Sequence, residues 1–328
     1  MSMKKLTLQD IQNANSRIKN DIIKTPIIEN NYINKLTGKN VFFKCENFQE
    51  TGSFKARGAL NAVKKAIEIG DKEVQGFLTH SSGNHGTALA WAAHIVCKNC
   101  IVVVPQNTPQ FKRKRIERYG ASLIFSDNTI KGREDTCEET RITTGFYVIQ
   151  PFNAFEVMAG QGTLAIDIEE EVPNCEAVLV AVGGGGLVSG ISTYFKERMK
   201  NIKVFCVDVE GKNLQDSILA KKRLWDDDGA SLDTIADGIR VKVVGDKCFE
   251  QVVNNCEEEV LTVNDEEIID AMKIIYEEMK IVVEPTGAVT FAGLLKYKDT
   301  ILKDIKNITL VVCGGNVSSY DISKIFSP

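Results

Sequence analysis

One lysine stands where it could react with an aldehyde. Lys55 lies in the stretch Ser53-Phe54-Lys55-Ala56-Arg57-Gly58, just after a polar turn and at the start of a helical pattern. The positive end of a helix, together with burial, lowers the pKa of a lysine and favours the neutral amine that attacks a carbonyl. The small residues Ala56, Gly58 and Ala59 would let a ligand approach the helix closely. An ordinary exposed lysine on an amphipathic helix is the competing interpretation.

Four consecutive glycines could bind a phosphate: Gly183, Gly184, Gly185 and Gly186. They follow the apolar strand pattern of residues 177–182 and precede a helical pattern. Backbone N–H groups without Cβ atoms beside them can face an anion, and a helix N-terminus adds partial positive charge. The rival interpretation is a nicotinamide dinucleotide site, since Asp208 ends the next strand pattern. Against it, Val188 stands where that motif needs its third glycine.

A third segment, Ser81-Ser82-Gly83-Asn84-His85-Gly86, follows a short strand pattern at 77–79 and precedes a helix predicted over 88–95. A loop that leads into a helix N-terminus can bind a carboxylate through its backbone N–H groups. Asn84 adds a donor and an acceptor. The competing interpretation is an ordinary Ser/Asn helix cap.

The composition excludes several classes of protein. A net charge of −4 over 328 residues argues against a nucleic-acid or anionic-membrane surface. No apolar run approaches the roughly 20 residues of a membrane span, and the N-terminus lacks a signal-peptide pattern. We therefore expect a cytoplasmic protein whose nine cysteines are thiols. Cys97 and Cys100 form a CxxC pair, but no second pair exists to complete a zinc site.

Strand-like and helix-like segments alternate along the chain. Strands are expected at 41–45, 77–79, 101–104, 123–125, 147–149, 177–182, 203–207 and 308–312. Helices are expected at 54–67 and at 265–279, where Asn264 and Glu267 have the spacing of a capping box. Continuous β-branched runs suit strands buried on both faces, which predicts an α/β protein with mainly parallel sheets and helices outside. The region 211–233 is poorly patterned, and Asp226-Asp227-Asp228-Gly229 is its most loop-like part.

Five motifs together carry a family resemblance: SFKARG, SSGNHG, the four glycines, Glu284-Pro285-Thr286 and Cys313-Gly314-Gly315-Asn316. In this order and spacing the chain resembles the pyridoxal-phosphate enzymes of the tryptophan-synthase β-like fold (fold type II), and most closely the serine racemase and threonine/serine dehydratase group. The resemblance runs from about Leu6 to Ser318. It implies a large domain of residues 1–75 and 150–328, a small inserted domain of residues 76–149, pyridoxal 5'-phosphate between them, and a homodimer.

The resemblance also implies roles for individual residues. Lys55 would be the Schiff-base lysine and the base that removes the Cα proton. The cofactor would contact Phe54, Lys55, Asn84, Asn153, Gly183, Gly184, Gly185, Gly186 and Cys313. The substrate, an amino acid such as serine or threonine, would contact Ser81, Ser82, Gly83, Asn84, His85 and Arg133.

One residue distinguishes the racemases of this group from its dehydratases. Racemisation needs a second acid/base on the opposite face of the carbanion, and racemases resemble this chain in having a serine at Ser82, where dedicated dehydratases usually carry alanine. We therefore expect interconversion of L-serine and D-serine with concurrent β-elimination to pyruvate and ammonia. Val241, which replaces a serine of mammalian-type racemases, is the opposing observation. The alternatives are a threonine/serine ammonia-lyase and, from another class, a pyridoxal-phosphate-binding regulatory pseudoenzyme.

Two further sites of the group are less well matched. A divalent cation (Mg²⁺, Mn²⁺ or Ca²⁺) would take carboxylates from Asp208, Glu210 and Asp216, whose register against the family ligands is ambiguous, and a solvated acidic loop is the competing interpretation. In the nucleotide site Tyr119, Lys280 and Asn316 match, whereas Glu50, Thr87 and Asn30-Asn31 depart from the pattern. These departures argue against activation by ATP.

Overall fold

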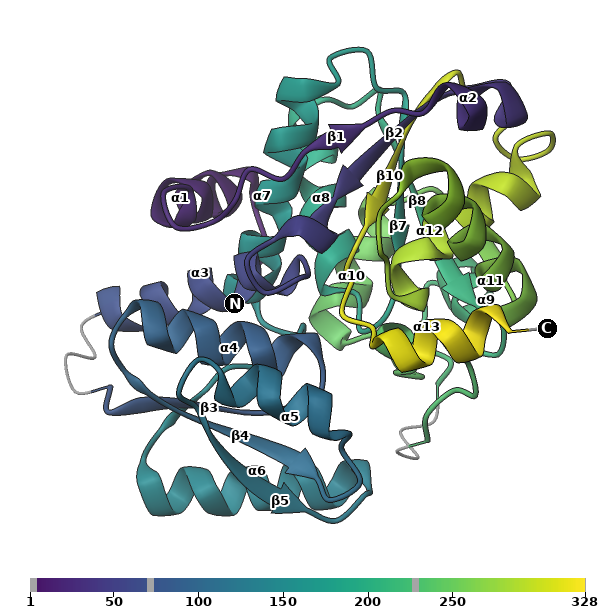
Figure 1. The fold of residues 1–328 in the computed structure, drawn as a ribbon. Coiled ribbons are helices and arrows are strands. Elements are labelled where there is room, and N and C mark those ends of the chain that lie inside the picture. The colour runs from purple at the N-terminus through teal and green to yellow at the C-terminus, as the bar shows by residue number, and fades with distance from the viewer. Residues whose placement is uncertain (1–4, 70–73, 226–229, 328) are drawn as a thin grey trace.

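The computed structural model describes residues 5–69, 74–225 and 230–327, which form two sheets (Figure 1). The larger sheet has the order β1-β2-β10-β7-β8-β9, and only β1 runs antiparallel to its neighbour. Its strands are β1 Ile27–Ile28, β2 Asn40–Cys45, β7 Ala177–Ala181, β8 Lys203–Val209, β9 Val260–Val263 and β10 Asn307–Val312. The smaller sheet has the order β5-β4-β3-β6 and is parallel throughout. Its strands are β3 Gly76–His80, β4 Asn99–Pro105, β5 Ser122–Ser126 and β6 Tyr147–Val148.

Helices cover both faces of the larger sheet, because its central strands are apolar on both sides. In β7, Val178 and Val180 face a core shared with α1, α7, α8 and α10, whereas Leu179 and Ala181 face a core shared with α11 and α12. Side chains alternate between the two faces of a strand, so one continuous apolar run supplies both cores. The bounds are α1 Leu8–Ile18, α7 Phe155–Glu171, α8 Gly186–Arg198, α10 Asp246–Asn255, α11 Asp265–Ile274 and α12 Pro285–Tyr297.

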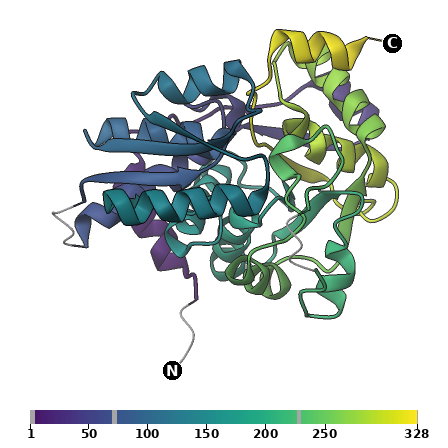
Figure 2. The same ribbon diagram turned by 90° about the horizontal axis from the view of Figure 1, so that it is seen from below.

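The smaller sheet is joined to the larger one through α3 (Lys55–Glu68), which packs against α4 (Asn84–Ile95) on one side and α7 on the other. Seen from below, the smaller sheet and its helices lie beside the larger sheet (Figure 2). The remaining helices are α2 Asn31–Thr37, α5 Gln110–Glu117, α6 Ile130–Thr144, α9 Leu214–Leu219 and α13 Ser319–Phe326, with short 3₁₀ turns at Glu46–Phe48 and Asp237–Ile239.

The predicted fold class is confirmed, and each of the eight predicted strands is present. The short strands β1 and β9 carry too few residues to show a pattern and were not predicted. The helix predicted over 265–279 has its Asn264/Glu267 capping box, but α11 ends at Ile274 and continues as a π-helix, Ile275–Met279. The helix expected from residue 88 begins four residues earlier, at Asn84.

The poorly patterned region 211–233 contains α9, and its predicted loop at Asp226–Gly229 lies outside the described residues. The strands of the smaller sheet all fall within residues 76–149, while the domain boundaries themselves stay a prediction. Within the described ranges, no helix has both the length and the apolarity needed to cross a membrane.

Candidate active site

The carboxyl ends of β3, from the smaller sheet, and of β7 and β10, from the larger one, open onto one pocket of about 710 Å³, where ligands of α/β proteins usually bind. Every predicted cofactor or substrate residue lines it: Phe54, Lys55, Ser81, Ser82, Gly83, Asn84, His85, Arg133, Asn153, Gly183, Gly184, Gly185, Gly186 and Cys313. The predicted metal ligands Asp208, Glu210 and Asp216 line a separate, smaller pocket of about 190 Å³. The chain thus gathers residues from well-separated motifs into one cavity.

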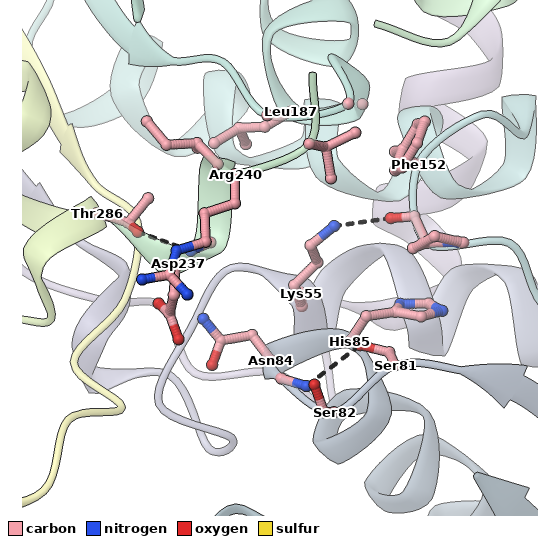
Figure 3. A pocket seen from close by; sticks show the side chains of 18 of the residues that line it. Lys55, Ser81, Ser82, Asn84, His85, Phe152, Leu187, Asp237, Arg240 and Thr286 are labelled. Atoms are coloured by element: carbon pink, nitrogen blue, oxygen red, sulfur yellow. Dashed lines mark hydrogen bonds between the residues drawn. The ribbon is translucent and has the colours of Figure 1, made fainter. Parts of the chain in front are cut away.

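Lys55 is the first residue of α3 and points into this pocket (Figure 3). The turn before it is fixed to the end of β10, because the Phe54 N–H donates to the Cys313 carbonyl at 3.1 Å. Its Nζ donates to the Pro151 carbonyl at 2.7 Å. Burial lowers the pKa of Lys55 to about 8, so a substantial part of the amine is neutral at mildly alkaline pH. This amine can act as a nucleophile or as a base.

A buried ion network anchors α3 at Arg57, two residues after Lys55. The Arg57 guanidinium donates to both carboxylate oxygens of Glu46, at 2.8 and 2.9 Å, and to Asp167 of α7 at 2.6 Å. Arg57 and Glu46 are fully buried. Because α7 packs against the larger sheet, this network fixes the helix that presents Lys55 to that sheet.

Gly183–Gly186, here called the glycine loop, connects β7 to α8. A Cβ at Gly184 would lie 2.3 Å from the Phe152 ring, and Gly185 has a φ of +93°. Larger residues are therefore excluded at both positions. The loop opens into the N-terminus of α8, so its amides and the helix dipole form a cradle for an anion.

Ser81–His85, here called the serine loop, connects β3 to α4. The Ser81 Oγ accepts from the Gly83 N–H at 3.3 Å, while no described group is hydrogen-bonded to the Ser82 hydroxyl. His85 is buried, and burial lowers its pKa to about 3, so its ring is neutral. Its Nε2 lies 3.2 Å from the Ile149 carbonyl and carries the proton, which leaves a buried Nδ1 without a partner in the described structure.

Asn84 belongs to a network that the sequence did not single out. Its Nδ2 donates to Glu284 at 2.7 Å, and its Oδ1 accepts from Asn316 at 2.6 Å. Burial, with a smaller contribution from the charge of Asp237, raises the pKa of Glu284 to about 7. The sequence did contain a signal for Glu284. It lies directly before Pro285, the first residue of the apolar helix α12, in the motif Glu284-Pro285-Thr286.

The structure also defines the surroundings of three other predicted residues, Asn153, Cys313 and Arg133. Both groups of the Asn153 amide have partners at the start of α10: its Nδ2 donates to Asp246 at 2.6 Å, and its Oδ1 accepts from the Lys247 N–H at 3.1 Å. Cys313 is buried, and burial raises its pKa well above the usual value, so it stays a neutral thiol. Arg133 reaches the pocket from α6.

Pocket residues that sequence reasoning missed come mostly from segments without a local motif: His80, Lys112, Arg115, Asp237 and Arg240. Lys112 of α5 is ion-paired with Asp237, across the boundary between the two sheets. Val241, noted as a departure from related racemases, also lines the pocket.

The predicted divalent-metal ligands do not fit a metal site. Asp208 is buried and ion-paired with Lys212 at 3.2 Å, while Glu210 and Asp216 are exposed. Across the described residues there is no group of three or more His, Cys, Asp or Glu side chains that could hold a metal ion. The cation beside Asp208 in this structure is the Lys212 ammonium.

Comparisons with known proteins identify the family of the chain. The family described as "Pyridoxal-phosphate dependent enzyme" matches residues 18–314. A serine racemase from Dictyostelium discoideum is 40% identical over 99% of this chain and 99% of its own length. The crystal structure of an aspartate racemase has a TM-score of 0.94 at 38% identity and covers 98% of this chain and 99% of that one. The crystal structure of a T.th. threonine deaminase has a TM-score of 0.88 at 32% identity, with coverages of 98% and 100%.

Proposed function

Because this chain belongs to the pyridoxal-phosphate-dependent enzymes, we propose that it interconverts L-serine and D-serine and also eliminates water from serine to give pyruvate and ammonia. The observation that carries the proposal is that the Lys55 amine and the Ser82 hydroxyl line the same pocket. A racemase needs two proton-transfer groups, and these two side chains come from different elements, α3 and the serine loop (Figure 3).

The residues present fit the cofactor. A half-buried amine that is hydrogen-bonded to a backbone carbonyl can attach to its aldehyde, and a loop with no room for a Cβ can take its phosphate. His85, whose buried Nδ1 has no partner in the described structure, also lines this pocket. When bound, the cofactor supplies electron withdrawal that acidifies the Cα–H bond of an attached amino acid.

Lys55 and Ser82 divide the proton transfers in this proposal. In the L-to-D direction one group takes the Cα proton and the other returns a proton from the opposite face; in the reverse direction they exchange roles. The backbone N–H groups at the start of α4 bind the substrate carboxylate. Elimination additionally needs a proton on the departing β-hydroxyl.

Threonine/serine ammonia-lyase activity is the second candidate, supported by the similarity to a threonine deaminase over the whole chain. In that case Ser82 only binds substrate. We leave a divalent metal out of the proposal, since Asp208 is engaged with Lys212. Activation by ATP is left out as well, on the departures at Glu50, Thr87 and Asn30-Asn31.

The test is a single assay of two products. Cofactor-loaded protein is incubated with L-serine, and D-serine and pyruvate are quantified together, beside Ser82→Ala. We expect D-serine from the unaltered protein, a loss of about 10²–10⁴-fold in the variant, and pyruvate from both. Pyruvate alone from both proteins would establish the lyase instead. L-aspartate is assayed in parallel, since an aspartate racemase is among the similar structures.

We also propose a cytoplasmic homodimer. All nine cysteines are free thiols, which suits a reducing compartment. Exposed apolar side chains that could meet a second copy are Tyr32, Phe48, Tyr276, Val282 and Tyr320. The segments that carry them touch, since Asn47 donates to the Val282 carbonyl and Asn30 donates to the Glu278 carbonyl. Light scattering on the protein as it elutes from a size-exclusion column tests the homodimer. A mass of one chain, 36.3 kDa, would contradict it.

A further inference from the structure

A buried lysine lies directly behind the glycine loop. Lys212 follows β8 after the turn at Gly211, and its side chain is 1% exposed. Its Nζ lies 3.2 Å from Asp208 Oδ1 and donates to the carbonyl oxygens of Val182 and, at 3.2 Å, Gly183. Its three N–H bonds therefore have three oxygen partners, one carboxylate and two carbonyls. This set of oxygens is the kind that a hard metal cation would take.

These contacts fix the direction of two peptide groups. In a trans peptide the C=O and the following N–H point in opposite directions. Since the carbonyls of Val182 and Gly183 point at Lys212, the N–H groups of Gly183 and Gly184 point away from it. No backbone acceptor among the described residues takes either N–H. Both glycines line the large pocket, so these donors are available to an anion there.

The Asp208 carboxylate keeps this ammonium in place. Both side chains are almost fully buried, with exposures of 1% for Lys212 and 2% for Asp208, and their opposite charges lie 3.2 Å apart. A buried lysine without an acidic partner would shed its proton and lose a donor. The ion pair thus keeps the Lys212 ammonium behind the loop without any bound ion.

We propose that Lys212 is a positioning residue whose ammonium takes the place of a divalent cation and orients the Gly183 and Gly184 amides toward the phosphate of the cofactor. The inference rests on the proposed cofactor site but not on the proposed reaction. It predicts that the protein holds its cofactor without a metal ion. It also predicts that loss of the ammonium weakens binding through the phosphate alone.

The experiment compares two ligands that differ only in the phosphate, pyridoxal 5'-phosphate and pyridoxal, bound to the apoprotein with EDTA present. Lys212→Met keeps the length of the side chain and removes its charge, and Lys196→Ala, on the exposed face of α8, is the control. Hydrogen bonds to charged groups predict about a 10- to 100-fold loss in affinity of Lys212→Met for pyridoxal 5'-phosphate. Its affinity for pyridoxal should change less than about threefold, because pyridoxal makes no phosphate contact.

A second variant, Lys212→Ala, leaves room beside Asp208 for a small cation. We expect methylammonium or Mg²⁺ to restore its affinity for pyridoxal 5'-phosphate in a saturable way, and to leave Lys212→Met, whose side chain fills the space, unchanged. Equal losses for both ligands in Lys212→Met would overturn the proposal, since that result means general damage to the fold. A fall in the affinity or melting temperature of the unaltered protein on adding EDTA, reversed by Mg²⁺, would overturn it as well. None of these readouts requires turnover of serine.

Discussion

The glycine loop and the serine loop have the same local design, a strand followed by a turn and a helix N-terminus, yet they differ in how firmly they are held. The carbonyls of Gly183 and Gly184 accept from Lys212 and from Gly245, and Gly184 and Gly185 are buried. In the serine loop Ser81, Ser82 and Gly83 are half-exposed, and the Ser82 hydroxyl has no hydrogen-bond partner in the described structure. A preorganised loop suits a cofactor that stays bound, and an open loop suits a substrate that must enter and leave.

Lys55 lies between the two loops. Its loss should have the largest effect, because in our proposal the loops bind the cofactor and the substrate while Lys55 performs the chemistry. Lys55→Ala removes the amine that attaches to the aldehyde and takes the Cα proton, so turnover should fall by at least about 10³-fold. Pyruvate and D-serine are measured together, and borohydride reduction followed by peptide mapping checks the attachment. Lys55→Arg, which keeps the charge without the nucleophile, should be equally inactive. Cofactor-dependent turnover by Lys55→Ala would refute the mechanism.

The cofactor side of the pocket can also be destabilised at the buried ion network that anchors α3. Glu46 supplies two hydrogen bonds to the fully buried Arg57, so Glu46→Ala leaves Asp167 as its one carboxylate partner among the described residues. Removing one partner of a buried ion pair costs about 3–5 kcal/mol, which a lower urea midpoint of unfolding would reveal. Glu68→Ala is the matched control: it removes the exposed partner of Arg17 and should cost about 0–1 kcal/mol. Equal midpoints for the two variants would mean that the buried network does not stabilise the fold.

A methyl group added to each loop compares them directly. In Gly184→Ala the new Cβ would lie 2.3 Å from the Phe152 ring. In Gly83→Ala the new Cβ would have no neighbouring atom within 4 Å, and φ there is −114°. Overpacking of this kind costs about 1–3 kcal/mol, so Gly184→Ala should bind pyridoxal 5'-phosphate roughly 5- to 150-fold more weakly. Gly83→Ala should keep the cofactor affinity of the unaltered protein. Fluorescence titration of the two apoproteins measures both, and comparable losses would show that the loops are equally constrained.

The sequence predicted the glycine loop, but it did not predict the Lys212 contacts that hold the loop. Strand, glycine run and helix follow one another locally, and the resemblance gave Lys55, Ser82 and Asn84 as one site; all of them line the pocket. The sequence did not predict that Lys212 would pair with Asp208, one of the residues expected to bind a metal. That contact depends on the turn at Gly211, which brings the ammonium back toward the end of β7. Long-range pairs of this kind carry no periodic signal, and the same holds for Lys112 with Asp237.

The smallest expected effect is a difference in pH dependence between the two sides of the pocket. Lys55 is protonated below its pKa of about 8, so the neutral amine, and with it the rate at which the apoprotein attaches to pyridoxal, should rise about tenfold per pH unit below 8 and level off above. His85, with its pKa lowered to about 3, is neutral across this whole range and adds no titration to substrate binding. Stopped-flow absorbance from about pH 6 to about pH 9.5 on the apoprotein follows the first process. A rate that still rises tenfold per pH unit up to about pH 9.5, as the ordinary lysine value of 10.5 predicts, would mean that burial does not activate Lys55.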